Sequence, residues 1–275
     1  MRPVIAIMKR NLLKFMRDRM RLVFTLVMSG LFMFIFSFAT RSMAAGIDHP
    51  MNYLIAGIVI MQVFQSSLSN SMHILEDIAS GFMKEIIVAP IARWQIALGQ
   101  ILSTMIIAVI QGYIVIGASF FLGFRVDALH VVMMAGLMLL TSFTFSSLGL
   151  LLAALTKEST NFQLLINFLT IPLVFLSGAY IPTTVLPKII MPVVFCNPLT
   201  YTTAAFRFIA LQMEKHPVDT LLGAGVAFRL GNMVIMPATG IVLSVVMGLV
   251  FFTLCVNRFG AADFSRIKVF HRRHG

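Results

Sequence analysis

Residues 74–93, ILEDIASGFMKEIIVAPIAR, form the one short internal segment of this sequence in which acidic and basic side chains crowd together. The charged members are Glu76, Asp77, Lys84, Glu85 and Arg93. Helical spacing gathers an apolar cluster beside them, made of Phe82, Met83, Ile86 and Ile87. Pro90 is expected to end this helix. A short charged helix with an apolar knob favours docking on a soluble partner, and the alternative is an ordinary solvated loop.

A second set of polar residues lies inside long apolar runs. These residues are amides and hydroxyls, namely Gln62, Gln65, Ser69, Gln111 and Asn167. Gln62, Gln65 and Ser69 share one helical face. Two interpretations remain open: hydrogen bonds between helices, or the lining of a substrate path or of a homodimer seam.

Several kinds of chemistry are missing from the sequence. No Asp, Glu, Lys or Arg lies within the long apolar runs, although ion-coupled transporters usually need such residues there. The sequence contains no Gly-Lys dipeptide, so a phosphate-binding P-loop is not expected. Neither a Ser/His/Asp set nor the spacing of zinc ligands is present. We therefore expect no catalytic residue, no metal site and no cofactor in this chain.

The composition indicates the elements that must position these residues. Of 275 residues, 59% are hydrophobic and only 11% are charged, against about 25% charged in a typical soluble domain. Apolar runs of about 20 residues predict membrane spans. We expect a single transmembrane domain over 1–275, an all-α polytopic membrane protein with six transmembrane helices. The expected spans are 22–40, 51–73, 94–122, 129–155, 162–180 and 234–256.

The net charge of +11 does not indicate a nucleic-acid partner, because the basic residues flank the spans. Most of the 21 Lys and Arg residues fall on the side that holds both termini and residues 74–93, which places that side in the cytoplasm. Residues 1–21 predict an amphipathic interface helix with a cationic stripe at Arg10, Lys14, Arg17 and Arg21. The opposite face, which should meet the acyl chains of membrane lipids, contains Ile5, Met8, Leu12, Phe15 and Met16.

The segment at 181–215 is irregular but apolar. Prolines interrupt it repeatedly, and each apolar piece is too short to cross a bilayer. We therefore expect re-entrant half-helices between spans 5 and 6. The residues singled out there are Pro182, Asn197, Pro198, Tyr201 and Arg207. Arg207 should either snorkel to the outer surface or pair within the hairpin, and we favour the pairing.

Three motifs together resemble the ABC type-2 exporter permeases, a family that includes drug, lipo-oligosaccharide and polysaccharide export permeases. EIIVAP at 85–90, followed by Arg93 and Gly99, is similar to the E-x-L-x-x-(T/A)-P segment of that family. The other two are LSGAYIP at 176–182 with Leu186-Pro187, and NPLTY at 197–201 with Phe206-Arg207. Each motif is loose, but their order and spacing cover essentially the whole chain.

The resemblance implies a permease subunit that works with a second permease copy and two nucleotide-binding ATPase subunits. ATP and Mg²⁺ would then bind to the partner, and residues 74–93 would be the cytoplasmic coupling loop. It also implies a multi-pass protein of a bacterial or archaeal cell (inner) membrane. The 25 Phe against 4 Tyr and 1 Trp favour an amphiphilic or hydrophobic substrate, such as a drug or a lipid-like molecule.

Other functions stay open at this point. The permease could export a polysaccharide or a lipid-linked glycan, although glycan channels favour Tyr and Trp platforms. An intramembrane enzyme would need inward-facing acids or a nucleophile with its base, and a scaffold protein would only recruit a partner. A neighbouring gene for an ATPase with a P-loop would favour the permease.

The orientation gives the first testable prediction. Accessibility tags at residues 1 and 275 should both report from the cytoplasm, because the basic flanks lie on that side. A tag near Asp219 should report from outside the cell. Protease or thiol-label accessibility of the three tags in intact cells checks this, and termini on opposite faces would exclude the six-span topology.

Overall fold

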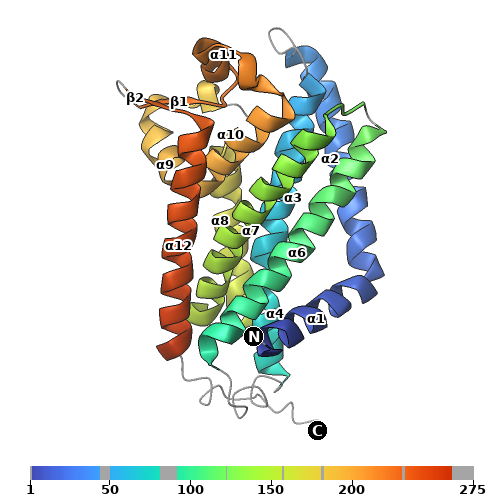
Figure 1. Cartoon of the computed structure of the whole chain (residues 1–275), viewed down its shortest axis with the longest axis vertical. Coiled ribbons are helices and arrows are strands. Elements are labelled where there is room, and N and C mark those ends of the chain that lie inside the picture. Colours follow the sequence, from blue (N-terminus) through green and yellow to red (C-terminus); the bar gives the residue numbers. More distant parts are fainter. Residues whose placement is uncertain are drawn as a thin grey trace.

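The computed structural model describes residues 2–43, 50–80, 92–121, 123–156, 158–180, 183–230 and 233–261. Figure 1 shows long helices running side by side along the long axis of the molecule. α1 and α4 lie at one end, and the short elements α9, α11, β1 and β2 gather at the other. The predicted coupling residues Phe82, Met83, Glu85, Ile86, Ile87 and Pro90 lie outside the described residues, as does Pro182.

Every element in the first half of the described chain is a helix. Its helices are α1 (Arg2–Arg17), α2 (Arg19–Met43), α3 (Pro50–Asn70), α4 (Met72–Ala79) and α6 (Arg93–Phe120). α3 and α4 are separated only at Ser71, where the chain makes a turn. Together they match the predicted second span, which continues further toward residue 78 than expected.

In the second half, two long helices come first, a series of short elements follows, and a last long helix ends the described chain. The elements are α7 (Ala128–Thr156), α8 (Ser159–Leu176), η1 (Thr183–Val185), η2 (Lys188–Ile190), α9 (Met191–Cys196), α10 (Pro198–Ala210), η3 (Met213–Lys215), α11 (Val218–Gly223), β1 (Phe228–Leu230), β2 (Met233–Ile235) and α12 (Pro237–Ala261). α10 and α12 both begin at a proline, whose fixed φ suits the first position of a helix.

Five helical segments are long and apolar enough to cross a membrane within the described residues. They are Met51–Ile78, Arg93–Phe120, Ala128–Thr156, Ser159–Leu176 and Pro237–Arg258. The remaining predicted span, 22–40, falls within the 25-residue helix α2. The described side chains of α2 end at Ile35, so the six-span count stays a prediction.

Two helices end or begin at other residues than the predicted spans. The span predicted at 162–180 ends as a helix at Leu176, because Gly178 takes a left-handed φ of 80° in the turn that follows. The span predicted to start at residue 234 begins at Pro237 instead. Residues 233–235 form an antiparallel hairpin with 228–230, in which Arg229 lies opposite Val234. Apart from this short strand pair the described chain is mostly helical, consistent with the predicted all-α polytopic membrane fold.

α3 lies at the centre of the bundle. Its most apolar stretch, with the start of α4, is 83% buried, against 17% for α8 and 22% for α12. Ile55, Val59 and Val63 are fully buried in one apolar cluster, and Phe64 packs edge-to-face on Phe145 in another. α8 and α12 are therefore the outer helices, whose apolar faces are left to meet lipid or another chain.

Close packing of α7 on the α3–α4 turn gives the second prediction. A methyl group added at Gly149 would lie 2.5 Å from Ser71 Oγ and 3.3 Å from the Leu68 carbonyl oxygen. Gly149→Ala should lower the free energy of unfolding by about 1–3 kcal/mol through overpacking. The measurement is the thermal unfolding midpoint of the purified protein in detergent.

Gly136→Ala is the matched control, because it lies on the same helix with no atom within 4 Å of the added methyl. It should be neutral, or stabilising by up to about 1 kcal/mol from helix propensity. Equal midpoints for the two variants would show that α7 does not approach α3 as closely as described.

Candidate functional site

The end of the bundle at which α1 and α4 lie holds the flanks of the predicted coupling loop (Figure 1). α4 ends at Ala79 and α6 begins at Arg93, so the positions of both flanks are described. Asp77 in the last turns of α4 is buried, with only 4% of its side chain exposed. It accepts a hydrogen bond from Arg10 Nη2, and Lys14 Nζ lies 3.4 Å from its Oδ1. A buried carboxylate needs such partners to stay ionised.

These two cations come from α1, so the charge cluster ties the interface helix to α4. α1 also packs against α6 (Figure 1). The side-chain amide of Asn11 is buried between the two helices. Asn11 Nδ2 donates to Gln100 Oε1 at 2.6 Å and to Ser103 Oγ at 2.9 Å. The absence of a side chain at Gly99 permits this approach, because an added methyl would lie 3.1 Å from Ile7 Cβ.

The arrangement corrects the sequence-based picture of the interface helix. Two members of the predicted cationic stripe, Arg10 and Lys14, bind Asp77 of α4. Phe15, expected among the acyl chains, is only 3% exposed. Ile5 and Met16 do remain exposed. Asn11 carried no distinguishing pattern in the sequence, although a polar residue on the buried face of an amphipathic helix could have been noted.

A polar network continues from this end into the bundle. Arg21 Nη2 donates to Asn70 Oδ1 at 2.5 Å, and Asn70 Nδ2 donates to Ser66 Oγ at 3.2 Å. Ser66 Oγ donates in turn to Gln111 Oε1, and Gln111 Nε2 donates to Thr25 Oγ1 at 3.1 Å. Gln111 is thus buried, and both ends of its amide are hydrogen-bonded within this chain.

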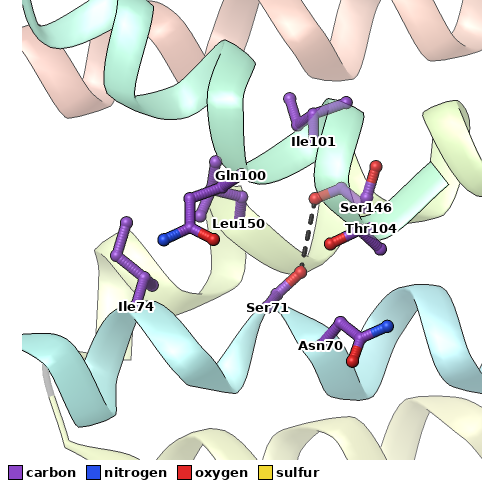
Figure 2. Close-up of a pocket in the computed structure, with 8 residues that line it drawn as sticks. All are labelled: Asn70, Ser71, Ile74, Gln100, Ile101, Thr104, Ser146 and Leu150. Carbon is purple, nitrogen blue, oxygen red and sulfur yellow. Dashed lines mark hydrogen bonds between the residues drawn. The ribbon is translucent and has the colours of Figure 1, made fainter. Parts of the chain in front are cut away.

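A narrow cleft, too tight to hold a water molecule, lies beside this network, between α3–α4, α6 and α7. Figure 2 shows the side chains that line it, which are Asn70, Ser71, Ile74, Gln100, Ile101, Thr104, Ser146 and Leu150. Ser71 Oγ donates to the Ser146 carbonyl at 3.4 Å. Asn70 and Gln100 are already bonded to Arg21 and Asn11. The pocket is therefore a polar seam between helices rather than an open substrate chamber.

The other predicted polar residues lie on uncovered faces. Gln65 is exposed, and Gln62 and Ser69 are partly exposed on the same face of α3. On the outer helix α8, Asn167 is exposed and its Oδ1 accepts a hydrogen bond from Gln163 Nε2 at 3.0 Å. A bare lipid environment would leave exposed amides such as Gln65 poorly satisfied.

The predicted residues of the outer hairpin form a connected joint. Asn197 caps α10 by accepting from the Leu199 N–H at 3.0 Å, and its amide donates to the Leu173 carbonyl at 2.7 Å. Tyr201 Oη donates to the Phe195 carbonyl at 2.7 Å, which links α10 back to α9. Arg207 is 1% exposed and donates to the Ala179 carbonyl. Pro198 is buried at the first turn of α10.

Within the parts of the chain that the structure describes, no group of three or more His, Cys, Asp or Glu side chains could hold a metal ion. The acidic residues engaged in ion pairs there lie at the two ends of the bundle. The chemistry of the site is therefore that of helix contacts and polar surfaces.

The charge cluster at Asp77 gives the third prediction. Asp77→Asn should lower the free energy of unfolding by about 2 kcal/mol, because Arg10 would lose its anion while still partly buried. The effect should be smaller than for a fully buried pair, since Lys14 is half exposed. The thermal unfolding midpoint in detergent measures it. Glu76→Gln is the control next to it, because Glu76 is exposed and forms its ion pair with His73. This change should alter the midpoint little. Asp77→Asn with the stability of the parent would refute this role.

Comparison with known proteins identifies the family. The sequence profile described as "ABC-2 type transporter" matches residues 2–211. The chain is 27% identical to the "Inner membrane transport permease YadH" of Escherichia coli strain K12 over 187 residues, covering 65% of this chain and 70% of that protein. It is also 26% identical over 164 residues to the "Putative transport permease ycf38" of Cyanophora paradoxa, covering 59% of this chain and 57% of that protein.

The match to the family profile covers well over half of the 275 residues, and it includes α1, the loop at 74–93 and α10. Membership of this family implies association with an ABC ATPase subunit. The chain belongs to the ABC-2 type transporter family, and it is an integral membrane protein that serves as a transport permease subunit, not an enzyme.

Proposed function

We propose that this chain is the membrane-spanning subunit of an ATP-driven exporter that moves an amphiphilic or hydrophobic substrate out of the cytoplasm or the inner leaflet. Two permease copies and two ATPase subunits make the complete transporter. It resides in the cell (inner) membrane of a bacterium or an archaeon. The name of the E. coli relative gives the inner membrane as the location of that protein. Both termini face the cytoplasm.

One observation carries the proposal: helices α3 and α8 present amides on faces that the rest of the chain leaves uncovered. Gln62, Gln65 and Ser69 follow one another along α3, the most buried helix of the bundle. Asn167 lies on α8, which contacts both α3 and α4. Amides exposed at membrane depth are expected to face protein or a polar path rather than lipid. The substrate path therefore runs along this face, and the second permease copy closes it.

The energy comes from outside this sequence. No Asp, Glu, Lys or Arg lies at 51–72, 94–120, 128–156, 159–176 or 237–257, and the Gly-Lys pair of a P-loop is absent. Coupling to an ion gradient would require ionisable groups within the membrane. An ABC ATPase partner supplies the energy instead, with ATP and Mg²⁺ bound on that subunit.

The coupling loop at 74–93 receives the motion of the ATPase. Its flanks are held on both sides, since Asp77 binds α1 and α1 is bonded to α6 through Asn11. A force applied between these flanks is therefore transmitted to α3, α6 and α1 together. The residues that we propose for the contact with the ATPase are Phe82, Met83, Glu85, Ile86, Ile87 and Pro90.

At the opposite end, α9 and α10 form the re-entrant hairpin. α10 is buried almost entirely, including its polar residues Thr200, Thr202, Thr203 and Arg207. Polar and irregular backbone is tolerated at membrane depth only where protein surrounds it. Burial of this kind supports a hairpin that dips into the outer half of the bundle and closes the path there.

The experiment that tests the function is co-purification of the permease with its ABC ATPase, followed by reconstitution into liposomes. Addition of an amphiphilic substrate should stimulate ATP hydrolysis by the complex. The ATPase reconstituted alone is the control and should not respond. Failure to find any co-purifying ATPase, or hydrolysis that no amphiphile alters, would contradict the proposed function.

The coupling loop gives the fourth prediction. Glu85→Ala and Ile87→Ala should each weaken ATPase binding by about 2 kcal/mol or more, roughly thirtyfold, if these side chains anchor the interface. Both variants should still insert into the membrane and dimerise. A pull-down of the ATPase, with transport in liposomes, measures the effect.

Glu158→Ala is the matched control for these variants. Glu158 lies in the other inner loop, exposed and bonded only to Asn161 among the described side chains. Its removal should change neither binding nor transport. If Glu85→Ala and Ile87→Ala also behaved like the parent protein, residues 82–90 would not be the coupling element.

A further inference from the structure

Arg207 lies at a junction of three elements near the outer end of the bundle. Its Nη2 donates to the Ala179 carbonyl at 2.7 Å, in the turn that follows α8. Its guanidinium carbon lies 3.7 Å from the centre of the Tyr53 ring on α3. Gly57, one turn along α3, lets the turn approach, because a methyl group there would lie 2.4 Å from the Ala179 oxygen. The contact thus joins α3, α10 and the end of α8.

The positive charge at this junction is incompletely neutralised. In the described part of the chain, the carboxylates that form ion pairs are Asp77, Glu76, Asp127 and Glu214, and none of them pairs with Arg207. The Nε of Arg207 is buried without a hydrogen-bond partner. One carbonyl and one aromatic ring therefore replace the full shell of water that a guanidinium has in solution.

An anion would satisfy this guanidinium better than the present partners do. Carboxylate and phosphate oxygens accept two parallel N–H bonds from arginine, and such charge-assisted bonds are roughly twice as strong as neutral ones. The Ala179 carbonyl offers a single neutral acceptor. An anionic group that reached Nε and Nη2 would therefore displace it.

The junction lies beyond the outer end of the uncovered polar face of α3. From Gln62 to Tyr53 the helix rises about 14 Å toward the outer end. The two helices that carry the exposed amides, α3 and α8, also supply Tyr53, Gly57 and the turn at Ala179. Nine residues turn a helix by about 180°, so Tyr53 lies on the opposite side of α3 from Gln62. A head group that moves outward along the amide face must therefore pass the turn at Ala179 to reach the guanidinium.

We propose that Arg207 is a specificity-determining residue for amphiphiles with an anionic head group. The head group binds the guanidinium, replaces the Ala179 carbonyl, and so separates the turn after α8 from Gly57 and α3. The outer hairpin is thereby released only when an anion is present. This inference rests on the proposed transport function and names the substrate class of that path.

The test compares two amphiphiles with the same alkyl chain on the purified permease in neutral detergent. Dodecyl phosphate is anionic, and dodecylphosphocholine has no net charge. Dodecyl phosphate should bind the parent protein about tenfold more tightly, read as a shift of the thermal unfolding midpoint over a concentration series. Arg207→Gln should reduce the difference to within about twofold, and Arg207→Lys, which keeps the charge but loses the planar fork, should fall between.

Gly57→Ala covers the case in which Arg207→Gln fails to fold. The added methyl forces the Ala179 carbonyl away while Arg207 remains. This variant should bind dodecyl phosphate at least as tightly as the parent, since the anion no longer competes with the carbonyl. Gly117→Ala, a membrane-helix glycine with no atom within 4 Å of the added methyl, is the matched control and should behave as the parent.

Equal binding of the two amphiphiles by the parent protein would overturn the inference, and so would a preference for dodecyl phosphate that persists in Arg207→Gln. Loss of that preference in Gly57→Ala would overturn it as well. These measurements use the permease without its ATPase, so they are independent of the co-purification experiment. A transporter that hydrolyses ATP in response to amphiphiles but shows no charge preference would keep the proposed function and exclude only this substrate class.

Discussion

The end of this permease at which α1 and α4 meet depends on the burial of one carboxylate. Asp77 is nearly inaccessible to solvent, and a buried anion is stable only with cations or hydrogen-bond donors around it. Both cations come from α1, which must therefore pack across the end of the bundle rather than lie apart from it at the membrane surface (Figure 1). Asn11 then fixes α1 on α6. The consequence is a rigid frame around both flanks of the loop through which we propose that the ATPase acts.

α3 connects that frame to the outer hairpin. One of its faces is fully apolar and buried, another carries the hydrogen-bonded Ser66 and Asn70, and a third presents Gln65 to the outside. At its outer end Tyr53 covers the guanidinium of Arg207. A displacement at Asp77 on α4 would reach Arg207 through the adjoining helix α3, because tightly packed interiors transmit strain. Asp77 and Arg207 thus lie near opposite ends of the segment formed by α3 and α4, with the exposed amides between them.

Hydropathy was sufficient to predict the long helices, because 18 or more apolar residues in a row leave few alternatives. The 3.6-residue period also placed Gln62, Gln65 and Ser69 on one face, and that face is indeed the less buried one. Partner choice was not predictable. Nothing in the spacing of Arg10 and Lys14 says that they bind Asp77, more than sixty residues away. The end of α8 depends on the left-handed turn at Gly178, and the pairing of β1 with β2 on contacts between strands of three residues, neither of which apolar composition reveals.

The central claim is that this chain is the membrane path of an exporter driven by a separate ATPase. The most direct measurement is the uptake of a fluorescent amphiphile into inside-out vesicles that contain the permease and its ATPase. Uptake should require ATP and both proteins, and it should cease when ATP hydrolysis by the partner is blocked. Uptake by the permease alone under an imposed proton gradient, or no ATP-dependent uptake with both proteins present, would contradict the account.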